Sequence, residues 1–169
     1  MTSFSLRQVR LRPGEELRDA VEIEVLPFDF GGQRYIAIPE KVPAELTLNR
    51  TTSGTAFRLR FGVRLHGPCV RCLGEAALAL AVDAREYQAN DPRGDEELSS
   101  EYVGENELEL SGWARDAVAL ELPDQIVCRA DCAGLCPVCG KNLNDEPHEH
   151  EESQPDSRWA ALESLRDRL

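Results

Sequence analysis

Six cysteines, arranged in two clusters, restrict the folding of this chain more than any other feature of its sequence. The first cluster is a C-x-x-C pair, and the second is a longer segment that ends in another C-x-x-C pair. Two thiolates separated by two residues can bind one tetrahedral ion, and the turn between them directs backbone amides at the sulfurs. This pattern predicts metal ligands. The six residues are Cys69, Cys72, Cys128, Cys132, Cys136 and Cys139.

The expected compartment favours the same interpretation. No stretch approaches the roughly 18 consecutive apolar residues that suggest a membrane span. Residues 1–7 lack the apolar run and the cleavage site of a signal peptide. We therefore expect a cytoplasmic protein with no membrane association, in an environment where disulfides are rare. An even set of cysteines there indicates metal before it indicates bridges.

Two histidines complete a set of ligands for two tetrahedral ions. His148 and His150 follow the second cluster, and zinc suits sites rich in thiolates. We expect one or two Zn²⁺ ions. The preferred partition assigns the first four cysteines to one ion and the last two cysteines, with both histidines, to the other. Its sets are Cys69, Cys72, Cys128 and Cys132, then Cys136, Cys139, His148 and His150. The alternative joins the two C-x-x-C pairs in one site, as in a zinc ribbon.

Other interpretations apply to single residues. His148 and His150 lie in an acidic stretch and are also compatible with solvated side chains, whereas His66 is interpreted as a bystander at a strand end. Free cysteines can act as small buried hydrophobic residues. A thiol–disulfide active site is disfavoured, because no βαβ pattern surrounds either C-x-x-C pair.

The sequence predicts no enzyme. Catalytic zinc sites keep an open position and use His or carboxylate ligands beside a general base, whereas thiolates dominate here. The chain has no H-E-x-x-H, P-loop or G-x-S-x-G motif. His66 is not followed by the Glu that zinc deaminases place two residues later. We expect neither catalysis nor a small-molecule substrate.

Period-two alternation predicts a β-hairpin around the first C-x-x-C pair. Apolar residues occupy every odd position from Phe57 to Leu65 and every even position from Ala76 to Ala84. The predicted register pairs Phe61 with Leu80, so that the apolar residues share one face. It also sets Arg58 opposite Asp83 as a cross-strand ion pair.

The expected architecture is α+β, with an antiparallel β-rich N-terminal part and a zinc-clamped C-terminal part that carries two short helices. Residues 1–90 form the β unit, with further strands at 21–25 and 44–48. Residues 91–106 form an acidic linker. Residues 107–169 contain a short strand-like segment, a helix capped by Ser111 and ending near Leu120, the cysteine cluster, and an amphipathic helix from about residue 156.

The distribution of charge restricts the partners. The net charge is −12, and all of the acidic excess lies in residues 91–169, because residues 1–90 carry a net charge of +1. Binding of a polyanion requires a basic face, which only the first half could supply. The candidate face is a stripe of Arg58, Arg60 and Arg64 on the outside of the hairpin, with Arg71 in the turn. The alternative is a solubilising outer sheet face that Asp83 partly neutralises. Arg7, Arg10 and Arg12 belong to an N-terminal strand or arm with no assigned partner.

Four segments together resemble the YceD family, the large ribosomal RNA subunit accumulation protein family. They are the 69–73 turn (CVRCL), the helix end at 120–123 (LELP), the cysteine segment 128–144 and the tail 156–162 (DSRWAAL). The resemblance is best from about residue 43 to the end. Similar proteins tend to carry a C-x-C pair where this chain has His148 and His150, and Pro where it has Ser157.

The resemblance implies a non-enzymatic ribosome biogenesis factor that supports synthesis, processing or accumulation of 23S ribosomal RNA. The implied partner is a ribosomal RNA precursor, an rRNA-processing protein or a ribosomal protein. The alternative function is a nucleic-acid-binding zinc-ribbon accessory protein of transcription, against which the acidic charge and the few aromatic residues count.

Overall fold

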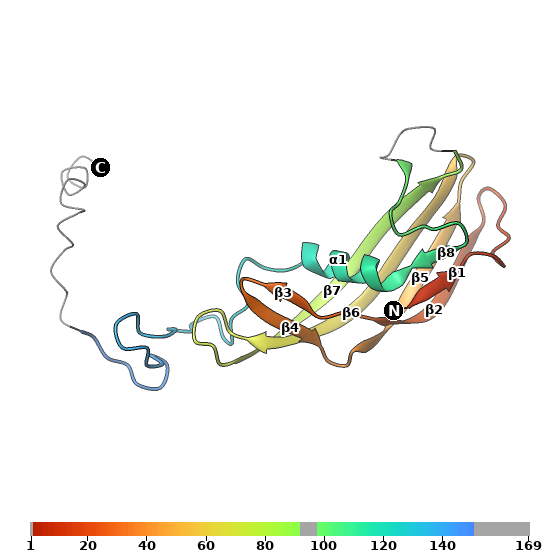
Figure 1. Cartoon of the computed structure of the whole chain (residues 1–169). Helices are drawn as coiled ribbons and strands as arrows, with labels where there is room; N and C mark the ends of the chain where they lie inside the picture. Colours follow the sequence, from red (N-terminus) through yellow and green to blue (C-terminus); the bar gives the residue numbers. More distant parts are fainter. Residues whose placement is uncertain (1, 92–97, 151–169) are drawn as a thin grey trace, which may run out of the picture. The chain divides into compact units, whose positions relative to one another are not determined.

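The computed structural model describes residues 2–91 and 98–150, which divide into two compact units, Met1–Cys132 and Ala133–Leu169. Residues 107–132 belong to the first unit, together with the N-terminal β structure. The division into 1–90, 91–106 and 107–169 stays a prediction. The elements of the first unit (Figure 1) are β1 (Ser3–Ser5), β2 (Glu16–Glu24), β3 (Phe28–Phe30), β4 (Gln33–Ala37), β5 (Lys41–Arg50), β6 (Gly54–Pro68), β7 (Glu75–Ala89), β8 (Glu107–Glu109) and α1 (Leu110–Leu120).

An antiparallel sheet forms the body of this unit, and β6 is its central strand. β7 pairs with β6 along its whole length, from Gly54 to Pro68. Along its other edge, β6 pairs first with β5 and then, at Leu65 and His66, with β4. β2 pairs with β5, and β3 pairs with β4 through a hairpin turn at Gly31 and Gly32. The predicted antiparallel β-rich N-terminal part is confirmed.

The register of the β6–β7 hairpin differs from the predicted register by two residues. Phe61 pairs with Val82 instead of Leu80, so every apolar side chain keeps its predicted face. The predicted register would place Cys69 opposite Cys72 across a two-residue turn. In the structure Pro68 pairs with Glu75, and residues 69–74 form a wider turn that the C-x-x-C pair occupies.

The shift also changes the expected ion pair on the outer face. Arg58 lies opposite Arg85, and Asp83 lies opposite Arg60. The Arg58 guanidinium nevertheless reaches Asp83 diagonally, with 2.6 Å between Nε and Oδ1. The ion pair is therefore present, although the direct cross-strand pairing that predicted it is wrong.

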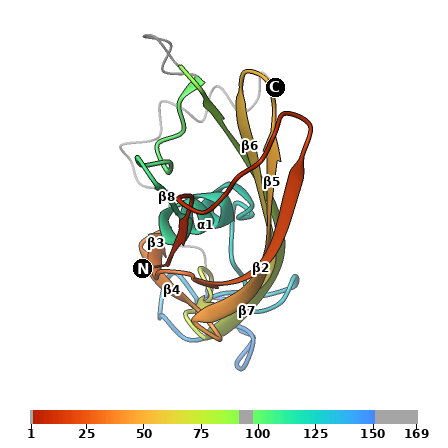
Figure 2. The ribbon, with the colours of Figure 1, turned by 90° about the vertical axis from the view of Figure 1, so that its right-hand side faces the viewer.

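Helix α1 covers the apolar face of the sheet. It contacts β7 and β2, strands that lie on different sides of the β5–β6 pair, so it crosses that face (Figure 2). Trp113, Ala117 and Val118 are buried against the sheet. Their spacing places them on one side of a helix, and burial of apolar area there is the main stabilising term. The same spacing predicts that Leu120 also lies on this buried side, and that prediction is wrong, because Leu120 is 88% exposed at the last turn.

The helix begins with Glu109 as its N-cap instead of Ser111. The Glu109 carboxylate accepts hydrogen bonds from the backbone amides of Ser111 and Gly112, at 3.0 and 2.7 Å. Ser111 is fully buried and has a different contact, because its hydroxyl accepts a hydrogen bond from the Thr2 amide at 2.7 Å. The hydroxyl therefore anchors the N-terminal segment.

The described residues contain one of the two predicted helices. The second, from about residue 156, lies outside the described residues. No described helix is long and apolar enough to cross a membrane.

The N-terminal segment and part of the predicted linker pack against the rest of the first unit. β1 pairs with β8, and Arg7, Arg10 and Arg12 follow β1 in a segment that is not a strand. Ser100 is buried, and Tyr102 stacks on Trp113 with ring centroids 6.4 Å apart. The Tyr102 hydroxyl donates to the Asp116 carboxylate at 2.9 Å. Residues 98–103 therefore form part of the surroundings of α1.

The cap of α1 can be tested by substitution. Glu109→Ala removes the side-chain acceptor of the Ser111 and Gly112 amides, while the Ser111 amide keeps the Thr2 carbonyl at 3.2 Å. We therefore expect a loss of about 1 kcal/mol in the free energy of unfolding. Urea denaturation measures this loss. Glu107→Ala, an exposed change in the same strand, is the control, and an equal loss in both variants would contradict the capping role.

Candidate metal centres

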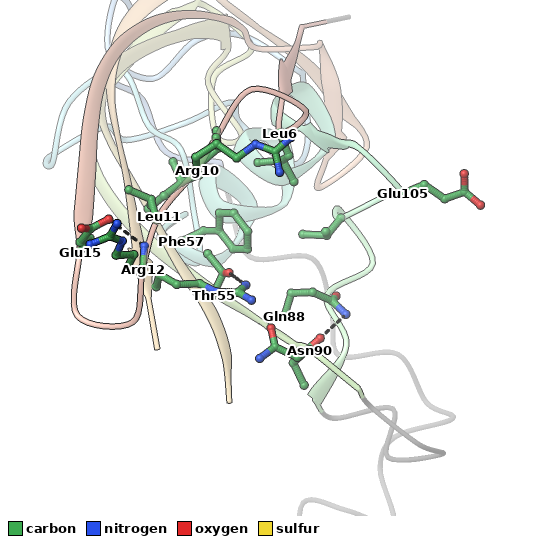
Figure 3. Close-up of a pocket in the computed structure, with 16 residues that line it drawn as sticks. Leu6, Arg10, Leu11, Arg12, Glu15, Thr55, Phe57, Gln88, Asn90 and Glu105 are labelled. Carbon is green, nitrogen blue, oxygen red and sulfur yellow. Dashed lines mark hydrogen bonds between the residues drawn. The ribbon is translucent and has the colours of Figure 1, made fainter. Parts of the chain in front are cut away.

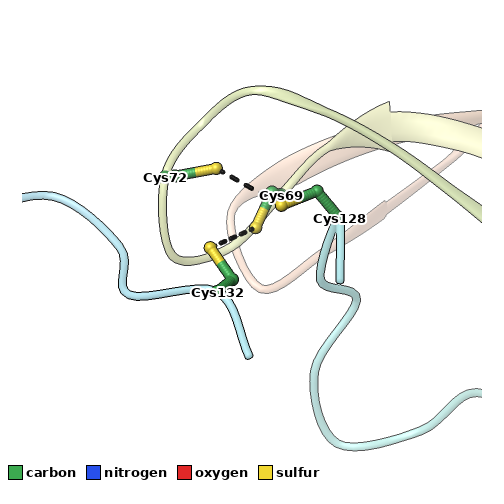
Figure 4. A group of neighbouring side chains, drawn as sticks. All are labelled: Cys69, Cys72, Cys128 and Cys132. Carbon is green, nitrogen blue, oxygen red and sulfur yellow. Dashed lines mark hydrogen bonds between the residues drawn. The ribbon is translucent and has the colours of Figure 1, made fainter. Parts of the chain in front are cut away.

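Four cysteines from two distant segments converge at the tip of the β6–β7 hairpin (Figure 4). The hairpin turn supplies Cys69 and Cys72, and the segment after α1 supplies Cys128 and Cys132. The four sulfur atoms lie within 4.8 Å of one another. Cys69 and Cys132 are buried, Cys72 is half-buried and Cys128 is exposed. The site thus lies at the edge of the core.

The distances between the sulfurs fit a tetrahedral thiolate site. The Cys69 and Cys132 sulfurs are 3.8 Å apart, and the Cys72 and Cys128 sulfurs are 3.7 Å apart. A tetrahedron with zinc–sulfur bonds of about 2.3 Å has sulfur–sulfur edges of about 3.8 Å. A disulfide requires about 2.05 Å, and all six cysteines are free. Four converging thiols at these distances can hold a metal ion.

Backbone hydrogen bonds hold the two segments in place. The Cys69 amide donates to the Gly74 carbonyl at 2.6 Å, and the Val70 amide donates to the Ile126 carbonyl at 3.0 Å. The second bond joins the hairpin tip to the chain that leads into Cys128. The Arg71 guanidinium donates to the Cys132 carbonyl at 3.0 Å. Arg71 therefore has a structural contact at the site.

The backbone also favours ionisation of one sulfur. Burial raises the pKa of the Cys69 thiol, but the backbone amides of Cys72, Cys128 and Arg71 outweigh burial and lower the pKa to about 6. Burial and the neighbouring thiols raise the pKa of Cys128 to about 12. In the absence of a cation, the negative charge of one thiolate makes it harder to deprotonate the neighbouring thiols. A bound cation reverses this effect, because metal ligands must be deprotonated.

The second group lies entirely within the second unit. Cys136, Cys139, His148 and His150 place one donor atom each within 4.8 Å of the others. His148 Nε2 lies 3.1 Å from the Cys139 sulfur, and His148 Nδ1 lies 2.7 Å from the Glu146 carbonyl oxygen. A proton on Nδ1 leaves Nε2 free to coordinate a metal, the usual arrangement of a metal-binding histidine. Two thiols and two imidazoles suit zinc.

The two groups contain the same residues as the preferred partition. The two C-x-x-C pairs belong to different groups and to different units, and the zinc-ribbon alternative that joins them stays a prediction. His66 belongs to neither group, and its Nδ1 lies 3.9 Å from the Glu75 carboxylate.

The two C-x-x-C turns share one hydrogen-bond pattern. In each turn the first cysteine's carbonyl accepts from the amide four residues later, Leu73 or Gly140. Its own amide donates to the carbonyl five residues later, in Gly74 or Lys141. Leu73 has φ 60° and Gly140 has φ 74°. Glycine adopts this left-handed conformation without strain, so Leu73 carries strain that Gly140 avoids.

The sequence interpretation did not identify Leu73. Glycine follows the second C-x-x-C pair and suggested a tight turn there, whereas glycine comes one residue later in the first turn, at Gly74. The alignment of the two C-x-x-C segments would have shown that Leu73 occupies the position of Gly140.

The conformation of Leu73 leads to a test of the turn. Leu73→Val introduces a β-branched residue at φ 60° and should cost about 1 kcal/mol in the free energy of unfolding. Leu73→Asn should cost less, because asparagine tolerates the left-handed region and the Leu73 side chain is already 55% exposed. Urea denaturation of both variants decides this point. A valine variant more stable than the asparagine variant would mean that apolar contact outweighs backbone strain.

Two mycobacterial relatives match more than half of this chain. An uncharacterized protein of Mycobacterium tuberculosis is 43% identical over 101 residues, which cover 57% of this chain and 48% of the relative. A Mycobacterium leprae protein is 36% identical over 103 residues, 57% of this chain and 46% of the relative. The chain thus spans about half the length of these curated relatives. No solved structure matches it.

More distant relatives have informative names. A protein of Arabidopsis thaliana named "Large ribosomal RNA subunit accumulation protein YCED homolog 1, chloroplastic" is 32% identical over 63 residues, 37% of this chain and 20% of the relative. The family model described as "Large ribosomal RNA subunit accumulation protein YceD" matches residues 57–166, a range that contains most of β6, all of β7 and both groups of candidate ligands. The chain belongs to the YceD family.

Proposed function

We propose that this protein is a non-enzymatic factor that supports the synthesis, processing or accumulation of 23S ribosomal RNA and that carries structural zinc. The observation that carries the proposal is the family match over residues 57–166. The names of the Arabidopsis thaliana and Zea mays relatives support the same role. We place this role in the cytoplasm.

The composition of both candidate metal centres supports a structural role for zinc. Each group offers four protein donors, which fill a tetrahedral coordination sphere and leave no position for a reactive water. Zinc bound in the first centre would neutralise thiolates and cross-link Cys69 and Cys72 to Cys128 and Cys132. The ion would thereby hold the hairpin tip and the 126–132 segment as one rigid surface.

The charges on the outer face of the hairpin support a protein partner at that face. Arg58 pairs with Asp83, and Arg60 pairs with Glu45. Of the three arginines in the predicted stripe, Arg64 alone has no ion pair with another described residue. A stripe neutralised in this way contacts phosphates poorly. An rRNA-processing protein or a ribosomal protein therefore suits this face better than a ribosomal RNA precursor.

No observation favours the alternative of a zinc-ribbon accessory protein of transcription. The acidic net charge and the few aromatic residues of the chain count against it.

Metal content tests the proposed sites. The purified protein should contain about two zinc ions per chain, one for each set of four donors. Cys69→Ser with Cys72→Ser should reduce the content to about one, and so should His148→Ala with His150→Ala. Elemental analysis by mass spectrometry measures the ratio. His66→Ala is the matched control and should retain both ions. Native protein without stoichiometric zinc would contradict the structural role.

Ribosomal RNA levels test the proposed function. A strain that lacks this chain should contain less 23S relative to 16S ribosomal RNA, because the large-subunit RNA accumulates less well. Quantitative electrophoresis and sequencing of precursor ends measure the change. The wild-type chain and the His66→Ala variant should restore the ratio, and the Cys69→Ser, Cys72→Ser variant should not. An unchanged ratio in the deletion strain would refute the proposal.

A further inference from the structure

A cavity of about 830 Å³ lies at the end of the β6–β7 hairpin opposite to the cysteines (Figure 3). Its floor is formed by the buried side chains of Leu48 and Phe57 on β5 and β6. One wall is the N-terminal segment 6–15, and the facing wall is formed by residues 88–90 and 103–105. Its volume lies within the range of about 300–1,000 Å³ that is typical of small-ligand sites.

The N-terminal segment crosses this cavity as an arm fixed at both ends. The Leu6 amide donates to the Asn106 carbonyl at 2.8 Å. At the other end, the Gly14 amide donates to the Arg50 carbonyl at 2.7 Å, and the Arg50 amide donates to the Glu15 carbonyl at 3.0 Å. Residues 7–12 therefore span the cavity between two anchored points, which orders the cavity wall without filling the cavity.

Three arginines that line the cavity have no carboxylate partner among the residues that the structure describes. Arg10, Arg12 and Arg50 form no ion pair with any residue in the described ranges. Arg50 is oriented by a 2.7 Å hydrogen bond from its Nη1 to the Thr55 hydroxyl. In a chain with a net charge of −12, an unpaired group of guanidinium ions is an unusual local excess of positive charge.

The acidic residues of the cavity do not cancel this excess. Glu15 accepts a hydrogen bond from the Arg12 backbone amide at 2.7 Å, which fixes its carboxylate at the base of the arm. Glu105 extends away from the other lining side chains in Figure 3. Three guanidinium groups against two carboxylates leave a positive site.

The walls combine this charge with apolar surface. Leu6, Val9 and Leu11 on the arm and Val103 are apolar residues that line the cavity. Gln88 and Asn90 add amide groups, and Asn90 is fixed by a 3.1 Å hydrogen bond from its Nδ2 to the Thr52 carbonyl. A ligand that fits has an anionic group for the arginines and a flat, largely apolar body with polar edges.

We propose that this cavity binds one nucleotide of single-stranded RNA, with the phosphate at Arg10 and Arg12 and the base between the arm and the floor. Guanidinium groups match phosphate oxygens in geometry and charge. An unstacked base can enter such a cavity, whereas a base in a duplex cannot. The choice of RNA as the ligand rests on the proposed function. The cavity would give the protein a contact with one nucleotide, which does not require a broad basic face.

Binding of a labelled short single-stranded oligoribonucleotide, measured by fluorescence anisotropy, tests the site on the full chain. Arg10→Ala with Arg12→Ala should weaken binding by about tenfold, the loss expected for one or two charge-assisted contacts. The dependence of affinity on salt should also decrease, because fewer phosphates are neutralised. The control is Arg7→Ala with Arg18→Ala, which removes the same charge outside the cavity and should bind as the wild type does. Thermal denaturation verifies that both variants fold.

Competition separates the two sources of a nucleotide. Displacement of the labelled strand by uridine or adenosine monophosphate supports the site and identifies a free nucleotide as sufficient. Displacement by unlabelled strand alone supports the site and identifies the RNA chain as the ligand. Equal loss in the cavity and control variants, or no binding by the wild type, overturns the inference. A deletion strain with normal 23S levels, together with cavity-dependent RNA binding, would refute only the proposed function.

Discussion

The long pairing of β6 with β7 positions the rest of the first unit. The two strands remain paired from Gly54 with Ala89 to Pro68 with Glu75, so their apolar residues form one continuous face for α1. The same pairing separates two regions of different chemistry. At one end it presents the turn with Cys69 and Cys72, and at the other it forms part of the cavity beneath the N-terminal arm. A change in its register would displace both regions.

At the cysteine end, metal binding and packing depend on each other. Cys69 and Cys132 are buried, and they come from segments joined by few backbone bonds, such as that between Val70 and Ile126. Four thiols this close cannot all ionise without a compensating cation, because thiolates repel one another in a site with limited solvent. A bound ion converts this repulsion into attraction among the same atoms. Its binding free energy then contributes to folding, as in other small metal domains.

Sequence patterns predicted the features that follow from periodicity, such as which face of a strand is apolar. They did not predict the strand register, which depends on the width of a turn. Alternation identified the faces of β6 and β7, and the spacing of the cysteines indicated their two groups. The register was wrong because the wide turn at residues 69–74 sets the strand offset, and nothing in the alternation measures the width of a turn. The pairing of β1 with β8 joins residues far apart in sequence, so no local pattern could reveal it. The β3–β4 hairpin had a usable signal in Gly31 and Gly32, whose φ values of 58° and 77° suit a tight hairpin turn.

The acidic charge of the chain and its arginine cavity are compatible because electrostatic interactions in salt solution are local. At physiological ionic strength the Debye length is about 8 Å, so exposed carboxylates farther from the cavity are largely screened. Arg10 and Arg12 are exposed and Arg50 is half-buried, and all three line one partly apolar cavity, where a phosphate would lie close to several guanidinium groups at once. The outer sheet face differs in its pairing, since the guanidinium groups of Arg58 and Arg60 already pair with carboxylates. The sign of the net charge therefore disfavours extended contact with a polyanion but not a contact confined to one nucleotide.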